Sequence, residues 1–261
     1  MNKTNLQLTI HPLRALKDNY IWTIVNPIAK LAIVVDPGEA TPVEHFLNDQ
    51  GLTLSAILIT HKHGDHCAGI AQLKSHHVRV YAPVGAVTAH VTDTVIGGQV
   101  ILFPEFGLEC HVLAIPGHTL EHVAYYDGMR LFCGDTLFGA GCGRIFEGTP
   151  TQMYASLQQL ATLSPETLMY CGHEYTLANL RFALAVDPDH QPTLDRFEEV
   201  QKKMERHEPT LPVTLREELL TNPFLRCREE TVIHAVEMKV GKKLTNEIDV
   251  FAAMREWKNN F

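Results

Sequence analysis

The segment THKHGDH at residues 60–66 places four side chains of metal-binding type within six residues. It follows directly on the apolar run LSAILIT, which predicts a strand buried on both faces. In an extended segment residues two apart point the same way, so His61 and His63 are expected to converge. Asp65 and His66 follow as the chain enters a predicted helix. Because open α/β sheets place their sites at the carboxyl ends of strands, the segment predicts a metal centre.

Three further residues of ligand type follow a glycine close to the end of an apolar run: His118 in IPGHT, Asp135 in FCGDT and His173 in YCGHEY. The shared context predicts that all three reach one edge of the fold. The candidate set is then five histidines and two aspartates. One catalytic zinc needs three protein ligands, so seven suit two ions with a bridging carboxylate. Nitrogen and carboxylate donors leave zinc, iron and manganese open.

The elements that would position these residues alternate between strand and helix up to about residue 173. Asp127-Gly128 predicts a hairpin, and Thr41 and Gly51 are the expected N-cap and stop of one helix. The predicted strands are 6–13, 20–26, 30–36, 54–60, 78–83, 108–115, 122–127, 129–134 and 167–173. The predicted helices in this part are 41–51, 68–77 and 149–163.

After residue 173 the chain becomes helical, with segments separated by prolines and one glycine. The expected helices are 178–187, 194–207, 215–220, 229–240 and 247–258, and no strand is predicted there. Twelve of the fifteen histidines fall before this point. We therefore expect an α/β catalytic domain over residues 1–173 and a smaller all-helical domain over 174–261.

Composition excludes several classes of protein. With 45% hydrophobic and 20% charged residues, the chain is of globular type. A formal net charge of −8 argues against a nucleic-acid-binding protein that works by neutralising phosphates. No apolar stretch suits a membrane helix or a secretory signal, so a cytoplasmic location is expected. The six cysteines form no CxxC pair and are expected to be reduced thiols.

With its later His, Asp and His, THKHGDH resembles the metallo-β-lactamase superfamily, which implies an αββα sandwich. The motifs DNYIW, VVDPG, IPGHT, GDTLF, GCGR, CGHEYT and NPFLRCRE, with a basic helix at the carboxyl end, narrow the resemblance. Together they are similar to the hydroxyacylglutathione hydrolases, or glyoxalase II, over essentially the whole chain. The resemblance implies two divalent ions, zinc by expectation, with iron or manganese as alternatives.

The resemblance also implies the division of the ligands and the reaction. One ion would be held by His61, His63 and His118, the other by Asp65, His66 and His173, with Asp135 bridging. A metal-bridged hydroxide would hydrolyse S-D-lactoylglutathione to glutathione and D-lactate, the second step of methylglyoxal detoxification. Asp65 is the expected catalytic residue, orienting the water and accepting its proton.

Substrate contacts carried over from the family fall on Arg144, Tyr175, Arg255 and Lys258. Arg255 and Lys258 are three apart and share one face of a helix. Two departures bear on glutathione binding. Arg144 stands where relatives often have lysine, and Phe146 stands where they often have tyrosine.

Other functions compete with this interpretation. A sulfur dioxygenase with a single iron would leave the second ligand set without a purpose, and a β-lactamase would need export. A lactonase is a further alternative within the superfamily. A nuclease is disfavoured by the acidic charge, and a metal-sequestering protein by a site that keeps a metal-bound water. We expect a monomer acting on a small glutathione thioester, with no nucleic-acid or membrane partner.

Overall fold

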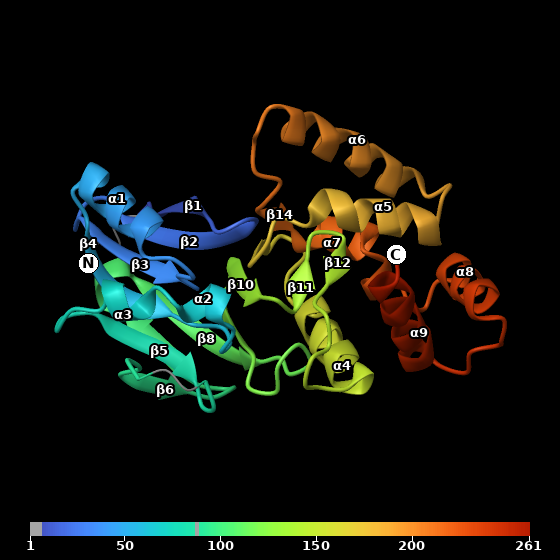
Figure 1. Ribbon diagram of the computed structural model, residues 1–261, viewed down its shortest axis with the longest axis horizontal. Coiled ribbons are helices and arrows are strands. Elements are labelled where there is room, and N and C mark those ends of the chain that lie inside the picture. Colours follow the sequence, from blue (N-terminus) through green and yellow to red (C-terminus); the bar gives the residue numbers. More distant parts are fainter. Residues whose placement is uncertain (1–6, 87–88) are drawn as a thin grey trace. The chain divides into compact units, whose positions relative to one another are not determined.

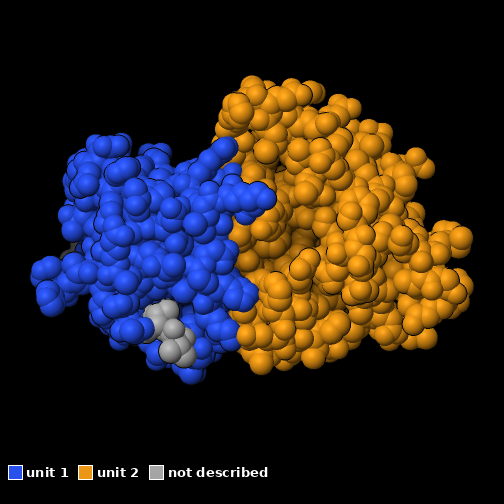
Figure 2. Space-filling view, viewed as in Figure 1, with its two compact units in different colours: residues 1–114, 121–134 blue, residues 115–120, 135–261 orange. Residues whose placement is uncertain are grey.

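The computed structural model describes residues 7–86 and 89–261. The chain divides into two compact units, which Figure 2 shows in different colours. Unit 1 comprises residues 1–114 and 121–134, and unit 2 comprises residues 115–120 and 135–261. This division does not coincide with the predicted boundary after residue 173, which stays a prediction.

Unit 1 contains a sheet of order β1-β2-β3-β4-β5-β6 (Figure 1). Pairing is antiparallel from β1 to β3 and parallel from β3 to β6. The central strands are apolar because both faces are covered, and Ile33 and Ile57 are completely buried. The strands are β1 (Thr9–Ala15), β2 (Asn19–Asn26), β3 (Leu31–Val35), β4 (Thr53–Leu58), β5 (Arg79–Pro83) and β6 (Asp93–Val95). All but β6 were predicted; residue 6, the predicted start of the first strand, lies outside the described residues.

The second set of strands in unit 1 is an antiparallel meander. It consists of β7 (Val100–Phe103), a 3-10 turn η1 (Pro104–Phe106), β8 (Leu108–Ala114), β9 (Val123–Tyr126) and β10 (Arg130–Gly134). The predicted hairpin is confirmed, with the Asp127 carboxylate accepting the backbone N–H groups of Met129 and Arg130 at 3.0 and 2.8 Å. The buried Tyr125 hydroxyl donates to the Ile59 carbonyl at 2.8 Å and links β9 to the chain after β4.

Helix α1 (Thr41–Gln50) belongs to unit 1 and stops at Gly51, as predicted, with Gly51 in the left-handed conformation. The predicted N-cap is wrong: Ala40 occupies that position, and Thr41 is already helical. Pro42 explains the shift, because a proline in the first turn has a preset φ and no N–H group to satisfy.

The predicted helix over 68–77 is also wrong in extent. Within this range the structure has the short helix α3 (Ile70–Leu73), and a second short helix, α2 (Gly64–Cys67), ends just before it. Gly69 separates them and donates its N–H to the Pro37 carbonyl at 2.9 Å. A Cβ atom on Gly69 would lie 2.7 Å from that carbonyl oxygen. This close approach to the turn after β3 breaks the helix.

The first strands of unit 2 form a small hairpin, β11 (Leu137–Phe138) and β12 (Gly141–Cys142). Helix α4 (Pro150–Ala161) follows, with a capping box between Thr149 and Gln152. Strand β13 (Leu168–Cys171) pairs with β14 (Val213–Thr214). Strand β14 is the exception to the expectation that no strand follows residue 173.

The predicted helices of the carboxyl-terminal part are confirmed. They are α5 (Thr176–Val186), α6 (Gln191–Glu205), α7 (Leu215–Thr221), α8 (Glu230–Val240) and α9 (Glu247–Asn259), with a 3-10 turn η2 (Pro223–Leu225) before α8. Their core is aromatic: the Phe224 ring lies 5.9 Å from Phe182 and 5.7 Å from Phe251, centroid to centroid. Among the described residues, none of the helices has the length and apolar character that crossing a bilayer requires.

Candidate metal centre

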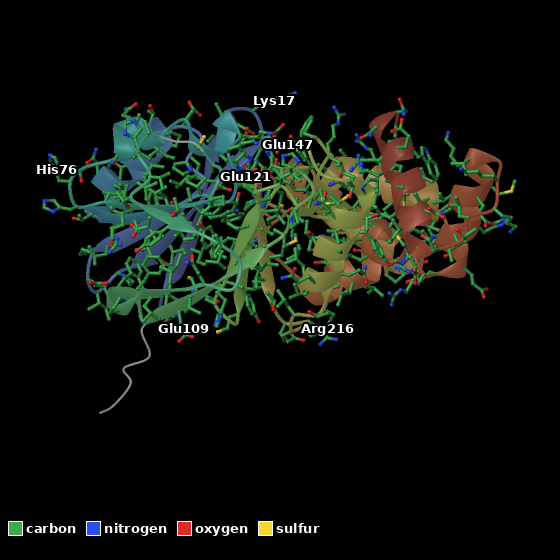
Figure 3. All side chains as sticks on the ribbon, turned by 90° about the horizontal axis from the view of Figure 1, so that it is seen from below. Lys17, His76, Glu109, Glu121, Glu147 and Arg216 are labelled. Atoms are coloured by element: carbon green, nitrogen blue, oxygen red, sulfur yellow. The ribbon has the colours of Figure 1, made fainter. Side chains whose placement is uncertain are left out.

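The two histidines that follow β4 converge. His61 is completely buried, and its Nε2 atom lies 3.1 Å from Nδ1 of His63. Between them Lys62 is exposed, and its backbone N–H donates to Glu121, which is labelled in Figure 3, at 3.1 Å. The bond to Glu121 therefore fixes the backbone at Lys62, and the rings of His61 and His63 on either side of it point the same way.

Asp65 and His66 occupy the start of α2. His66 Nε2 lies 3.5 Å from Asp65 Oδ2. The Asn19 side chain, at the start of β2, donates to Asp65 twice, to Oδ2 at 3.1 Å and to the backbone carbonyl at 3.2 Å. Gly38 packs against the same carbonyl, where a Cβ atom would lie 1.9 Å from the oxygen. The DNYIW and VVDPG motifs thus place the loop that carries Asp65.

Asp36 is a site residue that sequence reasoning missed. Its carboxylate accepts from the Thr60 N–H at 2.8 Å, the Thr60 hydroxyl at 2.7 Å and His66 Nδ1 at 3.0 Å. The Thr60 hydroxyl, having donated to Asp36, accepts from His61 Nδ1 at 3.0 Å. In the neutral ring, a hydrogen on Nδ1 leaves Nε2 with the lone pair through which a histidine binds a metal. The signal was present, because Asp36 also follows the end of a strand.

Asp36, His61 and His66 also bring donor atoms within 4.8 Å of one another. Because the Asp36 carboxylate is already engaged by Thr60 and His66, we assign it to orientation and not to metal binding. Outer carboxylates of this kind set the tautomer of a ligating histidine.

In unit 2 the structure brings together His118, Asp135 and His173, each buried. Asp135 Oδ2 lies 3.4 Å from His118 Nε2 and 3.3 Å from His173 Nε2. His118 donates from Nδ1 to the Arg144 carbonyl at 2.7 Å, since a carbonyl only accepts. In the neutral ring, Nε2 then presents a lone pair to a carboxylate oxygen. A cation between the two atoms, proton or metal, relieves that repulsion.

The spacing of these donor atoms fits a metal. Two Zn–N bonds of about 2.0 Å at a tetrahedral angle separate their donors by about 3.3 Å. The four pairs within the units, His61–His63, Asp65–His66, His118–Asp135 and His173–Asp135, span 3.1 to 3.5 Å. Each unit thus holds donor pairs at metal-binding separation, without any thiolate.

The predicted substrate residues all lie in unit 2, in different environments. Arg144 has an exposed side chain, and Tyr175 is half-buried with its ring stacked on His173 at 4.7 Å. Lys258 is half-buried, and its ammonium donates to the Ala178 carbonyl at 3.3 Å. Burial, with the nearby Arg255 charge, lowers the pKa of Lys258 to about 8.

Arg255 is buried, with 8% of its surface exposed. Its guanidinium donates from Nη1 to the Cys142 carbonyl at 2.8 Å and lies 5.3 Å from the centroid of the Phe224 ring. It is thus engaged inside unit 2. That Arg255 contacts the substrate stays a prediction.

All six cysteines are unpaired with one another, as predicted. Cys142, in the GCGR motif, is buried, and burial raises the pKa of its thiol even though the Arg255 charge opposes the shift. The thiol is therefore protonated at neutral pH, which disfavours a reactive role.

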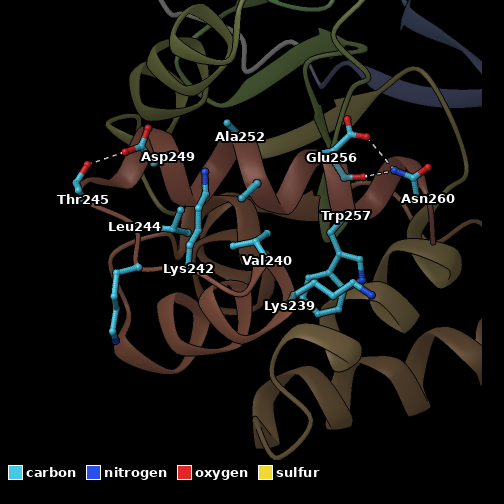
Figure 4. A pocket seen from close by; sticks show the side chains of 12 residues that line it. Lys239, Val240, Lys242, Leu244, Thr245, Asp249, Ala252, Glu256, Trp257 and Asn260 are labelled. Atoms are coloured by element: carbon cyan, nitrogen blue, oxygen red, sulfur yellow. Dashed lines mark hydrogen bonds between the residues drawn. The ribbon is translucent and has the colours of Figure 1, made fainter.

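A pocket of about 720 Å³ opens between α8 and α9 (Figure 4). Its lining includes Trp257, with the Lys239 ammonium 5.3 Å from the centroid of the indole, and Lys243, which is paired with Glu237 at 2.6 Å. The predicted site residues are not among the described residues that line it. The pocket is lined by residues of α8, of α9 and of the chain next to them, and we assign no role to it.

Comparison with known proteins identifies the family. Residues 20–173 match the family model of the metallo-beta-lactamase superfamily, and residues 174–261 match that of the hydroxyacylglutathione hydrolase C-terminus. Hydroxyacylglutathione hydrolase from Nitrosomonas eutropha is 49% identical over 97% of this chain and 99% of its own. The chain belongs to the hydroxyacylglutathione hydrolases.

Solved structures agree with the fold of this chain. ETHE1 from Myxococcus xanthus is 26% identical, with a TM-score of 0.63 over 97% of this chain and 98% of its own. TTHA1623, solved in a di-iron-bound form, is 25% identical, with a TM-score of 0.57 over 82% of this chain and 100% of its own. The predicted metallo-β-lactamase fold is confirmed. As a hydroxyacylglutathione hydrolase, the chain is an enzyme, and its His and Asp clusters imply divalent metal ions.

Proposed function

We propose that this chain hydrolyses S-D-lactoylglutathione to glutathione and D-lactate, the second step of methylglyoxal detoxification. Related S-(2-hydroxyacyl)glutathiones are the expected wider substrate class. The observation that carries the proposal is the 49% identity to a hydroxyacylglutathione hydrolase along 97% of the chain. The match includes the helical part of the chain, so it points to a narrower range of functions than the metallo-β-lactamase fold alone does.

The proposed metal centre holds two divalent ions. His61, His63 and His118 are the proposed ligands of one ion, Asp65, His66 and His173 of the other, and Asp135 the bridge. The approach of two imidazole nitrogens to one Asp135 oxygen, at 3.4 and 3.3 Å, supports a bridging role. Zinc is the proposed metal, with iron and manganese as alternatives, because all three accept nitrogen and carboxylate donors.

The chain's own side chains have distinct tasks in the proposed reaction. When bound, the ions lower the pKa of a water and polarise the thioester carbonyl. Asp65, held by Asn19 at 3.1 Å, accepts the proton of the attacking water. The water oxygen bonds to the carbonyl carbon, the C–S bond breaks, and the proton leaves with the thiolate of glutathione. Asp65 is the proposed catalytic residue.

The proposed substrate contacts are Arg144, Tyr175, Arg255 and Lys258. Glutathione carries two carboxylates, so cations are required to bind it. Arg144 has an exposed side chain, whereas the half-buried Lys258 donates to the Ala178 carbonyl and the buried Arg255 donates to the Cys142 carbonyl. Residues 1–173 are the proposed catalytic domain and 174–261 the proposed substrate-binding domain. We propose a monomer that acts in the cytoplasm.

The test is an assay of purified protein, stripped of metal and reloaded separately with zinc, iron or manganese. Hydrolysis of S-D-lactoylglutathione is followed beside glutathione persulfide, a lactone and a β-lactam, one substrate for each competing function. We expect the thioester to be the preferred substrate by kcat/KM with at least one metal. Absence of thioester hydrolysis with all three metals would contradict the proposal.

A further inference from the structure

The hairpin β11–β12 is held by side chains from the helical part of unit 2. Its backbone carbonyls accept from three residues: Gly139 from Asn179 at 2.9 Å, Gly141 from Asn222 at 2.9 Å, and Cys142 from Arg255 at 2.8 Å. The N–H of Ala140 donates to Glu218 at 2.9 Å. Asn179, Asn222, Arg255 and Glu218 form the hairpin clamp.

The hairpin needs outside support because of its turn. Ala140 has a φ of +53°, a left-handed conformation that a non-glycine residue adopts at a cost. The bond from its N–H to the Glu218 carboxylate fixes that conformation from outside the turn. The two-residue turn therefore depends on a side chain 78 residues further along the chain.

Glu218 and Asn222 are the centre of the clamp, and both are completely buried. Glu218 accepts from Arg196 at 2.5 Å and from Asn222 Nδ2 at 2.9 Å. The Asn222 Oδ1 atom accepts the Phe224 N–H at 3.1 Å and so begins η2. The asparagine of the NPFLRCRE motif, Asn222, thus joins the helical core to the hairpin, a task that the proposed chemistry had not explained.

The hairpin leads directly into the contacts of a proposed metal ligand. Two residues after Cys142, the Arg144 carbonyl accepts from His118 Nδ1 at 2.7 Å. Gly143, between Cys142 and Arg144, packs closely against Asp135 and His118. A Cβ atom on Gly143 would lie 1.8 Å from the Asp135 carbonyl oxygen and 3.3 Å from His118 Nδ1. A shift of the hairpin would therefore move the acceptor that sets the tautomer of His118.

We propose that Asn222 and Glu218 are positioning residues for His118, which they orient by holding the β11–β12 hairpin and, through it, the Arg144 carbonyl. The inference rests on the proposed function for the role of His118 as a metal ligand. It assigns part of the helical segment to metal binding in addition to substrate binding.

The experiment compares Asn222→Ala with Asp187→Asn in the full-length protein. Asp187→Asn is the matched control: it weakens a buried contact to Arg226, at 2.6 Å, in the same helical part without touching the hairpin. Zinc affinity is measured by chelator competition, and amide hydrogen exchange is measured over residues 138–146. We expect Asn222→Ala to weaken zinc binding by about 10- to 100-fold and to speed exchange in that segment. The control should keep wild-type values within about twofold, although both variants lower the melting temperature.

Wild-type zinc affinity in folded Asn222→Ala would overturn the inference, since a purely structural residue changes stability and not metal binding. Asn179→Ala covers the case in which Asn222→Ala does not fold. It removes only the bond to the Gly139 carbonyl and should weaken zinc binding in the same direction, by about threefold, a smaller loss than that expected for Asn222. Unchanged zinc binding in Asn179→Ala would then overturn the inference. Both readouts are independent of hydrolysis, so a zinc-binding wild type without thioester activity contradicts only the proposed function.

Discussion

His118 donates from Nδ1 to the backbone carbonyl of Arg144 across 2.7 Å. The loop that carries Arg144, a proposed substrate contact, is therefore joined by a hydrogen bond to His118, a proposed metal ligand. The contact leaves His118 Nε2 as the atom that would bind the metal, and this atom lies 3.4 Å from Asp135 Oδ2. Substitutions that move the loop should consequently change metal binding and catalysis together, whereas substitutions at the Arg144 side chain should change substrate binding alone.

Asp135→Asn tests the bridge. The change keeps the shape of the side chain and removes its charge, so the two imidazole nitrogens lose the carboxylate that faces them. We expect metal content to fall from about two ions per chain to one or fewer, and kcat to fall by more than about 100-fold. Elemental analysis and steady-state kinetics measure both quantities. His111→Ala, at an exposed histidine, is the control, and an Asp135→Asn protein that keeps two ions contradicts the assignment.

Asn19→Ala tests the placement of Asp65. Asn19 donates both to the carboxylate and to the backbone of Asp65, and alanine removes both bonds. Outer partners of this kind typically contribute 10- to 100-fold, so we expect kcat to fall by about that factor with KM little changed. Asn48→Ala, at an exposed asparagine of α1, should behave as wild type. Equal kcat in the two variants would show that Asn19 has no role in catalysis.

The pH dependence of KM tests Lys258. Burial and the charge of Arg255 lower the pKa of Lys258 to about 8, with the nearby Cys142 acting in the opposite direction. The ammonium is therefore charged below pH 8 and loses its proton as the pH rises through that value. If it binds a glutathione carboxylate, KM should rise by up to about tenfold between pH 7 and 9. Lys258→Arg stays charged and should lose this step; a step that persists in Lys258→Arg contradicts the assignment.

Arg255→Ala and Lys258→Ala should affect different kinetic parameters. Lys258→Ala removes a cation whose hydrogen bond and ring contacts are to Ala178, Phe182 and Phe261 and not to the hairpin backbone, so we expect a higher KM with kcat within about threefold of wild type. Arg255→Ala also releases the Cys142 carbonyl and thereby loosens the hairpin clamp. It should lower kcat by about tenfold or more and weaken metal binding. If both variants change only KM, Arg255 contacts the substrate directly and does not act through the hairpin.

Much of the candidate site could be predicted because its residues share a local context. His118, Asp135 and His173 each follow a glycine near the end of an apolar strand, and topology then sets where they lie. Asp36 follows β3 in the same way, but a single aspartate before Pro-Gly is also an ordinary turn former. Only the bonds from Thr60 and His66 distinguish it.

The hairpin clamp could not be predicted, because its bonds join residues far apart in the chain. Ala140 and Glu218 are separated by 78 positions. Glu218 lies in a helix with the pattern LREELL, where a glutamate is normally solvated. The predictions of the α1 N-cap and of the extent of α3 were wrong for local reasons. Pro42 allows α1 to begin at Thr41, and the close approach of Gly69 to Pro37 interrupts the helix predicted over 68–77.

The central claim, a thioester hydrolase with two metal ions, is tested most directly by activity against metal added. Metal-free protein is titrated with zinc, and hydrolysis of S-D-lactoylglutathione is measured after each addition. The account predicts that activity rises with metal and reaches its maximum at two equivalents per chain. Full activity at one equivalent, or none at any zinc concentration, would contradict it.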